Sequence, residues 1–109
     1  MKFNLILKWW RRKLTPPLKH LHVLMYTRQG CHLCEEAWRC LQEQQGRYYF
    51  TLEQRDVDAD PALAAEFGEW VPVVAVNGAV RFRGGVNPVL LRRLLDGEVA
   101  ALRRQGSSV

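Results

Sequence analysis

Two cysteines separated by two residues, Cys31 and Cys34, have the spacing in this sequence that best suits covalent chemistry. Gly30 breaks a strand pattern and a helical pattern follows it, so Cys31 is predicted to stand at the N-terminus of a helix. Unpaired backbone N–H groups and the positive end of the helix dipole stabilise a thiolate there, which is the nucleophilic form of cysteine. Cys34 follows one turn later and can attack a mixed disulfide formed on Cys31. The spacing therefore favours a dithiol that exchanges electrons with disulfides.

Arg28 and His32 are the basic residues nearest to this pair in the sequence. Arg28 precedes Cys31 by three residues and would add a positive charge that favours the thiolate. His32 lies between the cysteines and favours the thiolate when its ring is protonated, but much less when the ring is neutral. Both are therefore candidate substrate-binding residues, while Cys31 and Cys34 are the candidate catalytic residues.

Zinc binding is the alternative interpretation of a Cys-x-x-Cys pair. A zinc site needs about two further ligands at a suitable spacing. The other candidates are His20, His22, His32 and Cys40, and none of them forms a second pair of ligands. Cys40 falls on the apolar stripe of the predicted helix and is interpreted as a small buried residue. The sequence thus predicts no metal site.

Length and charge place the protein among small soluble domains. Its 109 residues, of which 48% are hydrophobic and 25% charged, fit a single globular domain. Residues 1–20 contain six Lys and Arg and no acid, so residues 21–109, with ten basic and eleven acidic side chains, are almost neutral. A near-neutral domain does not favour nucleic-acid binding. A closely spaced cysteine pair is typical of a reducing compartment, which predicts a cytoplasmic location.

Residues 1–20 form a basic leader that needs its own interpretation. The apolar run before Trp9 is too short for a signal peptide, or for a membrane span of about 20 apolar residues. One interpretation is a membrane-surface anchor, because Trp9 and Trp10 beside Arg11 suit an anionic headgroup region. The other is a short frayed or weakly docked helix that ends before Pro16 and has no function of its own.

From Leu21 onward, strand and helix patterns alternate. Strands are predicted at 21–27, 48–57, 71–76 and 79–83, and helices at 31–44, 62–67 and from Asn87-Pro88 onward. Asn77-Gly78 is a two-residue hairpin turn, and Asp60-Pro61 is a helix start. The order βαβαββα predicts an α/β fold with a mixed four-stranded sheet and helices on both faces. The domain is expected over residues 21–103, followed by a flexible tail at 104–109.

Val71-Pro72 opens the third predicted strand. Together with the Cys-x-x-Cys at a helix start and the strand–helix order, this pair resembles the thioredoxin superfamily, and the short chain resembles its glutaredoxin branch. The resemblance implies a thioredoxin-like fold, a cis bond between Val71 and Pro72 beside the cysteines, and a Val71 backbone that pairs with an extended substrate. Without the cysteine pair, Pro72 would be interpreted as an ordinary strand-opening proline.

Gly84-Gly85 followed by Asn87 is similar to the paired glycines with which glutaredoxins hold one end of glutathione. The helix N-terminus after Asn87 offers N–H groups that bind a carboxylate. Ordinary turn chemistry is the alternative for the two glycines. Trp70, just before Val71, either lines a substrate groove or packs on the sheet edge.

The cysteine chemistry and the resemblance together predict a thiol–disulfide oxidoreductase of the glutaredoxin type. The Cys-His-Leu-Cys sequence is most similar to small bacterial glutaredoxin-like proteins. Cys31 would attack a protein disulfide or a glutathione mixed disulfide, and Cys34 would resolve the intermediate. No bound cofactor is expected; glutathione as co-substrate, or a reductase, would supply electrons to a monomeric enzyme. The alternative is a non-catalytic thioredoxin-fold module that binds a partner, or a membrane surface through its basic leader.

Overall fold

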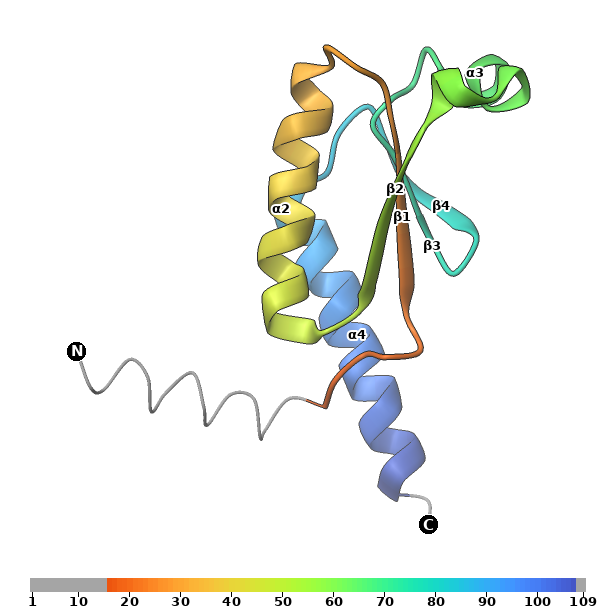
Figure 1. Ribbon diagram of the computed structural model, residues 1–109. Helices are drawn as coiled ribbons and strands as arrows, with labels where there is room; N and C mark the ends of the chain where they lie inside the picture. The colour runs from red at the N-terminus through yellow and green to blue at the C-terminus, as the bar shows by residue number, and fades with distance from the viewer. Residues whose placement is uncertain (1–15, 108–109) are drawn as a thin grey trace, which may run out of the picture.

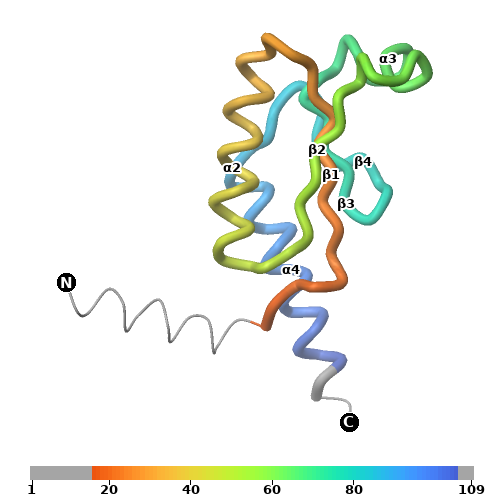
Figure 2. The backbone as a smooth tube through the Cα atoms, viewed as in Figure 1, coloured from red at the N-terminus to blue at the C-terminus, as the bar shows by residue number. Residues whose placement is uncertain are grey.

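The computed structural model describes residues 16–107, so the part of the predicted leader that carries Trp9 and Trp10 lies outside the described residues. The elements in chain order are β1 (His22–Thr27), α2 (His32–Tyr48), β2 (Thr51–Asp56), the 3-10 helix η1 (Val57–Ala59), α3 (Pro61–Phe67), β3 (Val73–Val76), β4 (Ala79–Arg83) and α4 (Pro88–Ser107). Figure 1 shows their arrangement, and the tube in Figure 2 follows β1 into the loop that leads to α2 at the upper end of the molecule.

The four strands form one mixed sheet in the order β2-β1-β3-β4. β1 and β2 are parallel because α2 carries the chain back between them, whereas β3 pairs antiparallel with both β1 and β4. The tight turn between β3 and β4 uses Asn77 (φ 49°) and Gly78 (φ 84°), and positive φ at both positions is what such a turn requires. This topology confirms the predicted α/β, thioredoxin-like fold class.

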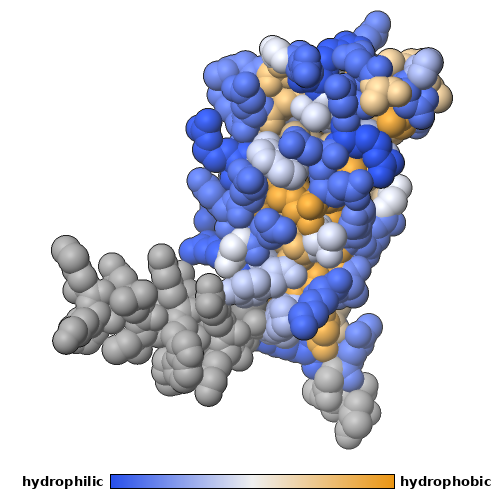
Figure 3. All heavy atoms as spheres, viewed as in Figure 1, coloured by the Kyte–Doolittle hydropathy of each residue, from blue (hydrophilic) through white to orange (hydrophobic). Residues whose placement is uncertain are grey.

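Helices cover both faces of the sheet. α2 and α4 lie on one face, and α3 lies on the other side near one end of the strands (Figure 1). Strand residues alternate between the two faces, so Met25 packs with the α2 and α4 side chains while Tyr26 packs with Phe67 of α3. The larger core consists of Leu18, Leu21, Val23, Met25, Cys34, Ala37, Leu41, Tyr48, Phe50, Val74, Val76, Leu91, Leu95 and Val99. Apolar atoms show in the middle of the face drawn in Figure 3, between polar residues.

Both ends of the domain reach further than the sequence predicted. Leu18 is fully buried, and its N–H donates to the carbonyl of Tyr48 at 2.8 Å, so the core includes residues before 21. α4 continues to Ser107, past the predicted boundary at residue 103. The N-terminal boundary differs because Leu18 packs in the larger core and bonds to the last residue of α2. A boundary placed where the basic charge ends does not reveal this packing.

α2 also runs past Gly46, where the sequence predicted its end. The helix stops instead at Tyr48, because Tyr49 adopts the left-handed conformation (φ 58°) and donates its N–H to the carbonyl of Gln45 at 2.9 Å. The buried Tyr48 side chain donates a hydrogen bond to Asp96 of α4. Packing and this hydrogen bond outweigh the cost of a helical glycine, which is about 1 kcal/mol.

The Tyr48 phenol gives the fold an expected sensitivity to alkaline pH. Burial, with the hydrogen bond to Asp96, raises the pKa of Tyr48 to about 12. In the unfolded chain the phenol ionises from about pH 10. Between about pH 10 and about pH 12 the unfolded chain therefore binds fewer protons than the folded one. The free energy of unfolding decreases as the pH rises through this range. In Tyr48→Phe this part of the alkaline loss is absent, and the free energy of unfolding at neutral pH is about 1 kcal/mol lower. Urea denaturation from pH 7 to pH 11 measures both effects, and identical alkaline slopes in the two proteins would contradict the assignment.

Candidate redox site

Cys31 is the N-cap residue of α2. Gly30 makes the turn from β1 possible because it adopts φ 75°, a conformation that side chains disfavour. The Cys31 Sγ accepts a hydrogen bond from the backbone N–H of Cys34 at 3.2 Å. The sulfur therefore occupies the position in which a helix end stabilises negative charge, as the sequence predicted.

The two cysteines differ in their access to solvent. They are joined by a disulfide, and their Cα atoms are 5.2 Å apart. Cys31 is partly exposed, whereas Cys34 is only 2% exposed and belongs to the core. A molecule that approaches from solvent consequently meets Cys31 first.

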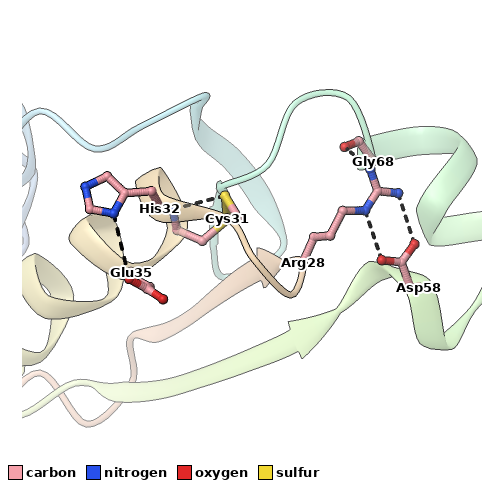
Figure 4. Close-up of a disulfide and its surroundings, with 7 residues drawn as sticks. Arg28, Cys31, His32, Glu35, Asp58 and Gly68 are labelled. Atoms are coloured by element: carbon pink, nitrogen blue, oxygen red, sulfur yellow. Dashed lines mark hydrogen bonds and ion pairs between the residues drawn. A yellow bond between two sulfur atoms is a disulfide. The ribbon is translucent and has the colours of Figure 1, made fainter.

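His32 lies on the outer surface of the first turn of α2. Its ring faces two carboxylates. Nε2 lies 3.2 Å from Glu36, and Nδ1 lies 3.9 Å from Glu35, the contact that Figure 4 shows. The His32 side chain is 81% exposed, so it is surrounded by water as well as by these acids. The structure thus places His32 next to the cysteine pair in sequence but turned toward acidic neighbours.

The structure does not bring Arg28 to the cysteine pair. Its guanidinium points away from Cys31 in Figure 4. It donates to both carboxylate oxygens of Asp58, at 2.9 and 3.0 Å, and to the carbonyl of Gly68 at 3.0 Å. The hydrogen bonds to Asp58 also raise the pKa of Arg28. Through these contacts Arg28 holds η1 and the end of α3 against the end of β1. Its positive charge is paired with the Asp58 carboxylate rather than with a thiolate at Cys31.

Val71 and Pro72 lie between α3 and β3, and the peptide bond that joins them is cis. Pro72 is buried and Val71 is half-buried. The carbonyls of Trp70 and Pro72 both accept the N–H of Gly84 at 2.9 Å. Within residues 16–107, no backbone hydrogen bond uses the N–H or the carbonyl of Val71. Trp70 is 53% exposed.

Gly84 and Gly85 form the connection from β4 to α4, and Gly84 adopts φ 76°. Asn87 caps α4 as predicted, since its Oδ1 accepts the N–H groups of Val89 at 2.9 Å and Leu90 at 3.2 Å. These are the donors that the sequence assigned to a glutathione carboxylate. The Asn87 side chain occupies them in the structure.

Residues 16–107 contain neither a cluster of metal-ligating side chains nor a helix that could span a membrane. No group of three or more His, Cys, Asp and Glu side chains converges to hold a metal there. No helix in the same range is long and apolar enough to cross a membrane. Cys40 is half-buried rather than fully buried, and burial raises the pKa of its thiol.

The strand order, the cysteine pair at the N-terminus of α2 and the loop before β3 define a protein of the thioredoxin fold with a dithiol–disulfide site. Residues 22–96 match the glutaredoxin-like domain family (DUF836). This match spans more than half of the chain, and the protein belongs to that family. No curated protein sequence matches the chain significantly.

Solved structures share the fold. A structural-genomics target protein from X. campestris is 27% identical with a TM-score of 0.58, and the alignment covers 69% of this chain and 96% of that one. A protein from Nitrosomonas europaea is 25% identical with a TM-score of 0.60, over 68% of this chain and 89% of the other. A thioredoxin from Halobacterium salinarum NRC-1 is 17% identical with a TM-score of 0.59, over 74% and 76%, which shows the shared fold alone.

Proposed function

We propose that this protein is a thiol–disulfide oxidoreductase in which Cys31 is the nucleophile and Cys34 the resolving cysteine. The observation that carries the proposal is the asymmetry of the pair. Cys31 is accessible and accepts an N–H hydrogen bond at the start of α2, whereas Cys34 is buried directly beneath it. An exposed, stabilised thiolate and a protected second thiol are what two successive exchange steps require.

The proposed cycle transfers two electrons from the dithiol to a substrate. The Cys31 thiolate attacks one sulfur of the substrate disulfide, the substrate S–S bond breaks, and one substrate thiolate leaves. A mixed disulfide between Cys31 and the other half remains. Cys34 loses its proton to solvent and attacks the Cys31 sulfur, which releases the second substrate thiolate. The substrate disulfide is then reduced, and the protein carries the Cys31–Cys34 disulfide.

The surroundings of the pair support a role for the backbone in this cycle. The unpaired N–H and carbonyl of Val71 can bond to an extended substrate segment, which then lies beside Cys31 as an added strand. The dithiol is regenerated by a second exchange with glutathione or with the dithiol of a reductase. The enzyme works as a monomer in the cytoplasm, where the low reduction potential of the thiol pool keeps such cysteine pairs reduced.

A Cys34→Ser variant tests the order of the two steps. Without the resolving thiol, the mixed disulfide on Cys31 persists, because no neighbouring sulfur can displace the bound substrate half. Intact-mass measurement after incubation with a disulfide substrate is expected to show one substrate half attached to most of the variant, and to none of the wild-type protein. Peptide mapping locates the adduct. An adduct on Cys40, or none, would contradict the proposed roles.

A further inference from the structure

We propose that the Cys31 site selects protein disulfides flanked by apolar and uncharged or basic residues, and disfavours glutathione and its disulfide. This inference rests on the proposed function and names its substrate class. It follows from three separate observations: the charge around Cys31, the occupied donors at the start of α4, and the apolar side chains exposed on the segments that carry Cys31 and Val71.

The charge around Cys31 is acidic. Glu35 in the first turn of α2 and Glu36, which follows it, are exposed, and His32 lies beside both of them. Arg28 is paired in a fork with Asp58 and faces away from the sulfur (Figure 4). Glutathione and its disulfide both carry a net negative charge. Binding either of them would bring further carboxylates toward these acids, and like charges at close range repel.

The N-terminus of α4 does not offset this repulsion. A helix N-terminus binds a carboxylate through its free N–H groups. Here the N–H groups of Val89 and Leu90 already donate to Asn87 at 2.9 and 3.2 Å. A glutathione carboxylate would have to displace a cap that is worth about 1 kcal/mol to the helix.

Two large apolar side chains are exposed on the segments that carry Cys31 and Val71. Leu33, between the two cysteines, is 52% exposed, and Trp70, which precedes Val71, is 53% exposed. Cys31 and Val71 pack against the same core cluster, and Figure 4 shows the chain from Gly68 to β3 passing close to Cys31. Exposed Leu and Trp side chains are typical of a surface that binds protein.

These features fit one occupant, an extended segment of a partner protein. Its backbone pairs with the free N–H and carbonyl of Val71, as in strand addition. An apolar residue next to its cysteine covers Leu33 or Trp70 and loses contact with water. A basic residue nearby is attracted by Glu35 and Glu36 rather than repelled.

The test compares two disulfides with the same reduced protein. One is glutathione disulfide, and the other is a disulfide-linked dimer of the blocked peptide acetyl-Leu-Cys-Lys-amide. Oxidation of the Cys31–Cys34 pair is followed by tryptophan fluorescence in a stopped-flow instrument. Each rate constant is divided by the rate constant of the same disulfide with 2-mercaptoethanol, which removes differences in intrinsic reactivity. The normalised rate is expected to be about tenfold or more higher for the peptide at low salt. The ratio of the peptide rate to the glutathione disulfide rate should decrease at 1 M salt, because the Debye length falls to about 3 Å and the charges are screened.

Variants separate charge from apolar contact. The Glu35→Gln/Glu36→Gln double variant should lower the ratio of peptide rate to glutathione rate severalfold, whereas Glu43→Gln, an exposed acid further along α2, should leave the ratio unchanged. Trp70→Ser should slow the peptide more than glutathione disulfide. A normalised rate for glutathione disulfide equal to or above that of the peptide would overturn the substrate proposal and leave the oxidoreductase intact. If neither disulfide oxidises the cysteine pair, the proposed function itself fails.

Discussion

Replacing Cys31 with serine reduces the turnover of disulfide substrates to the uncatalysed background. The serine hydroxyl keeps the position at the start of α2, but it is not ionised at neutral pH and cannot form the mixed disulfide. The expected loss is therefore complete, although the fold is preserved. Consumption of a disulfide substrate, coupled to an excess of thiol reductant, measures the rate in both proteins.

Cys40→Ser is the matched control for this experiment. Cys40 is on the same helix, carries the same functional group and is the free cysteine of the described residues. Burial raises the pKa of its thiol, so less of it is present as thiolate at neutral pH. The control is expected to retain wild-type turnover. Turnover that survives in Cys31→Ser and disappears in Cys40→Ser would show that Cys40 is the nucleophile and would contradict the proposed role of Cys31.

The second large effect is expected at Gly68, where α3 ends. A Cβ at this position would lie 2.4 Å from the carbonyl oxygen of Ala64 and 2.8 Å from the Arg28 guanidinium. Gly68→Ala must therefore shift α3 backbone and disturb the hydrogen bond from Arg28. We expect the free energy of unfolding to fall by about 1–3 kcal/mol, as for other overpacked buried positions. Urea denaturation at neutral pH gives this value directly.

Gly46→Ala is the control, and it should change stability in the opposite direction. Gly46 is helical and exposed within α2, and a Cβ there would have no neighbour within 4 Å. Alanine replaces glycine in a helix with a gain of about 0.5–1 kcal/mol. Equal stability changes for the two alanine variants would show that the close approach at Gly68 is not what makes glycine necessary there.

Local patterns predicted much of the fold because short-range chemistry determines those elements. β4 has the predicted bounds, Ala79–Arg83, and the Asn77-Gly78 turn and the Asp60 cap form as expected. The sequence predicts that α2 ends at Gly46, which is wrong, because the Tyr48 contact with α4 joins segments far apart in the chain. η1 was also not anticipated, since it depends on the Asp56 carboxylate accepting the N–H of Asp58.

The candidate site also contains features that the local sequence predicts and features that depend on residues far apart in the chain. The Cys31–Cys34 pair and the Asn87 cap could be inferred from neighbouring residues alone. Arg28 was assigned to the thiolate because it is close to Cys31 in sequence, but its partner Asp58 is 30 residues away. No local signal marks that pairing, and it reverses the electrostatic interpretation of the site. The role of Gly68 depends on the same pairing and could be found only from the folded structure.

The burial of Leu18 also fixes where the chain enters the domain. Its N–H bonds to Tyr48 at the C-terminal end of α2, while Cys31 caps the other end of this 17-residue helix. At 1.5 Å per residue, α2 separates the two points by about 25 Å. Leu18 therefore lies at the end of α2 opposite the sulfur, so a macromolecule that contacts the domain around Leu18 leaves the Cys31 end open to a substrate.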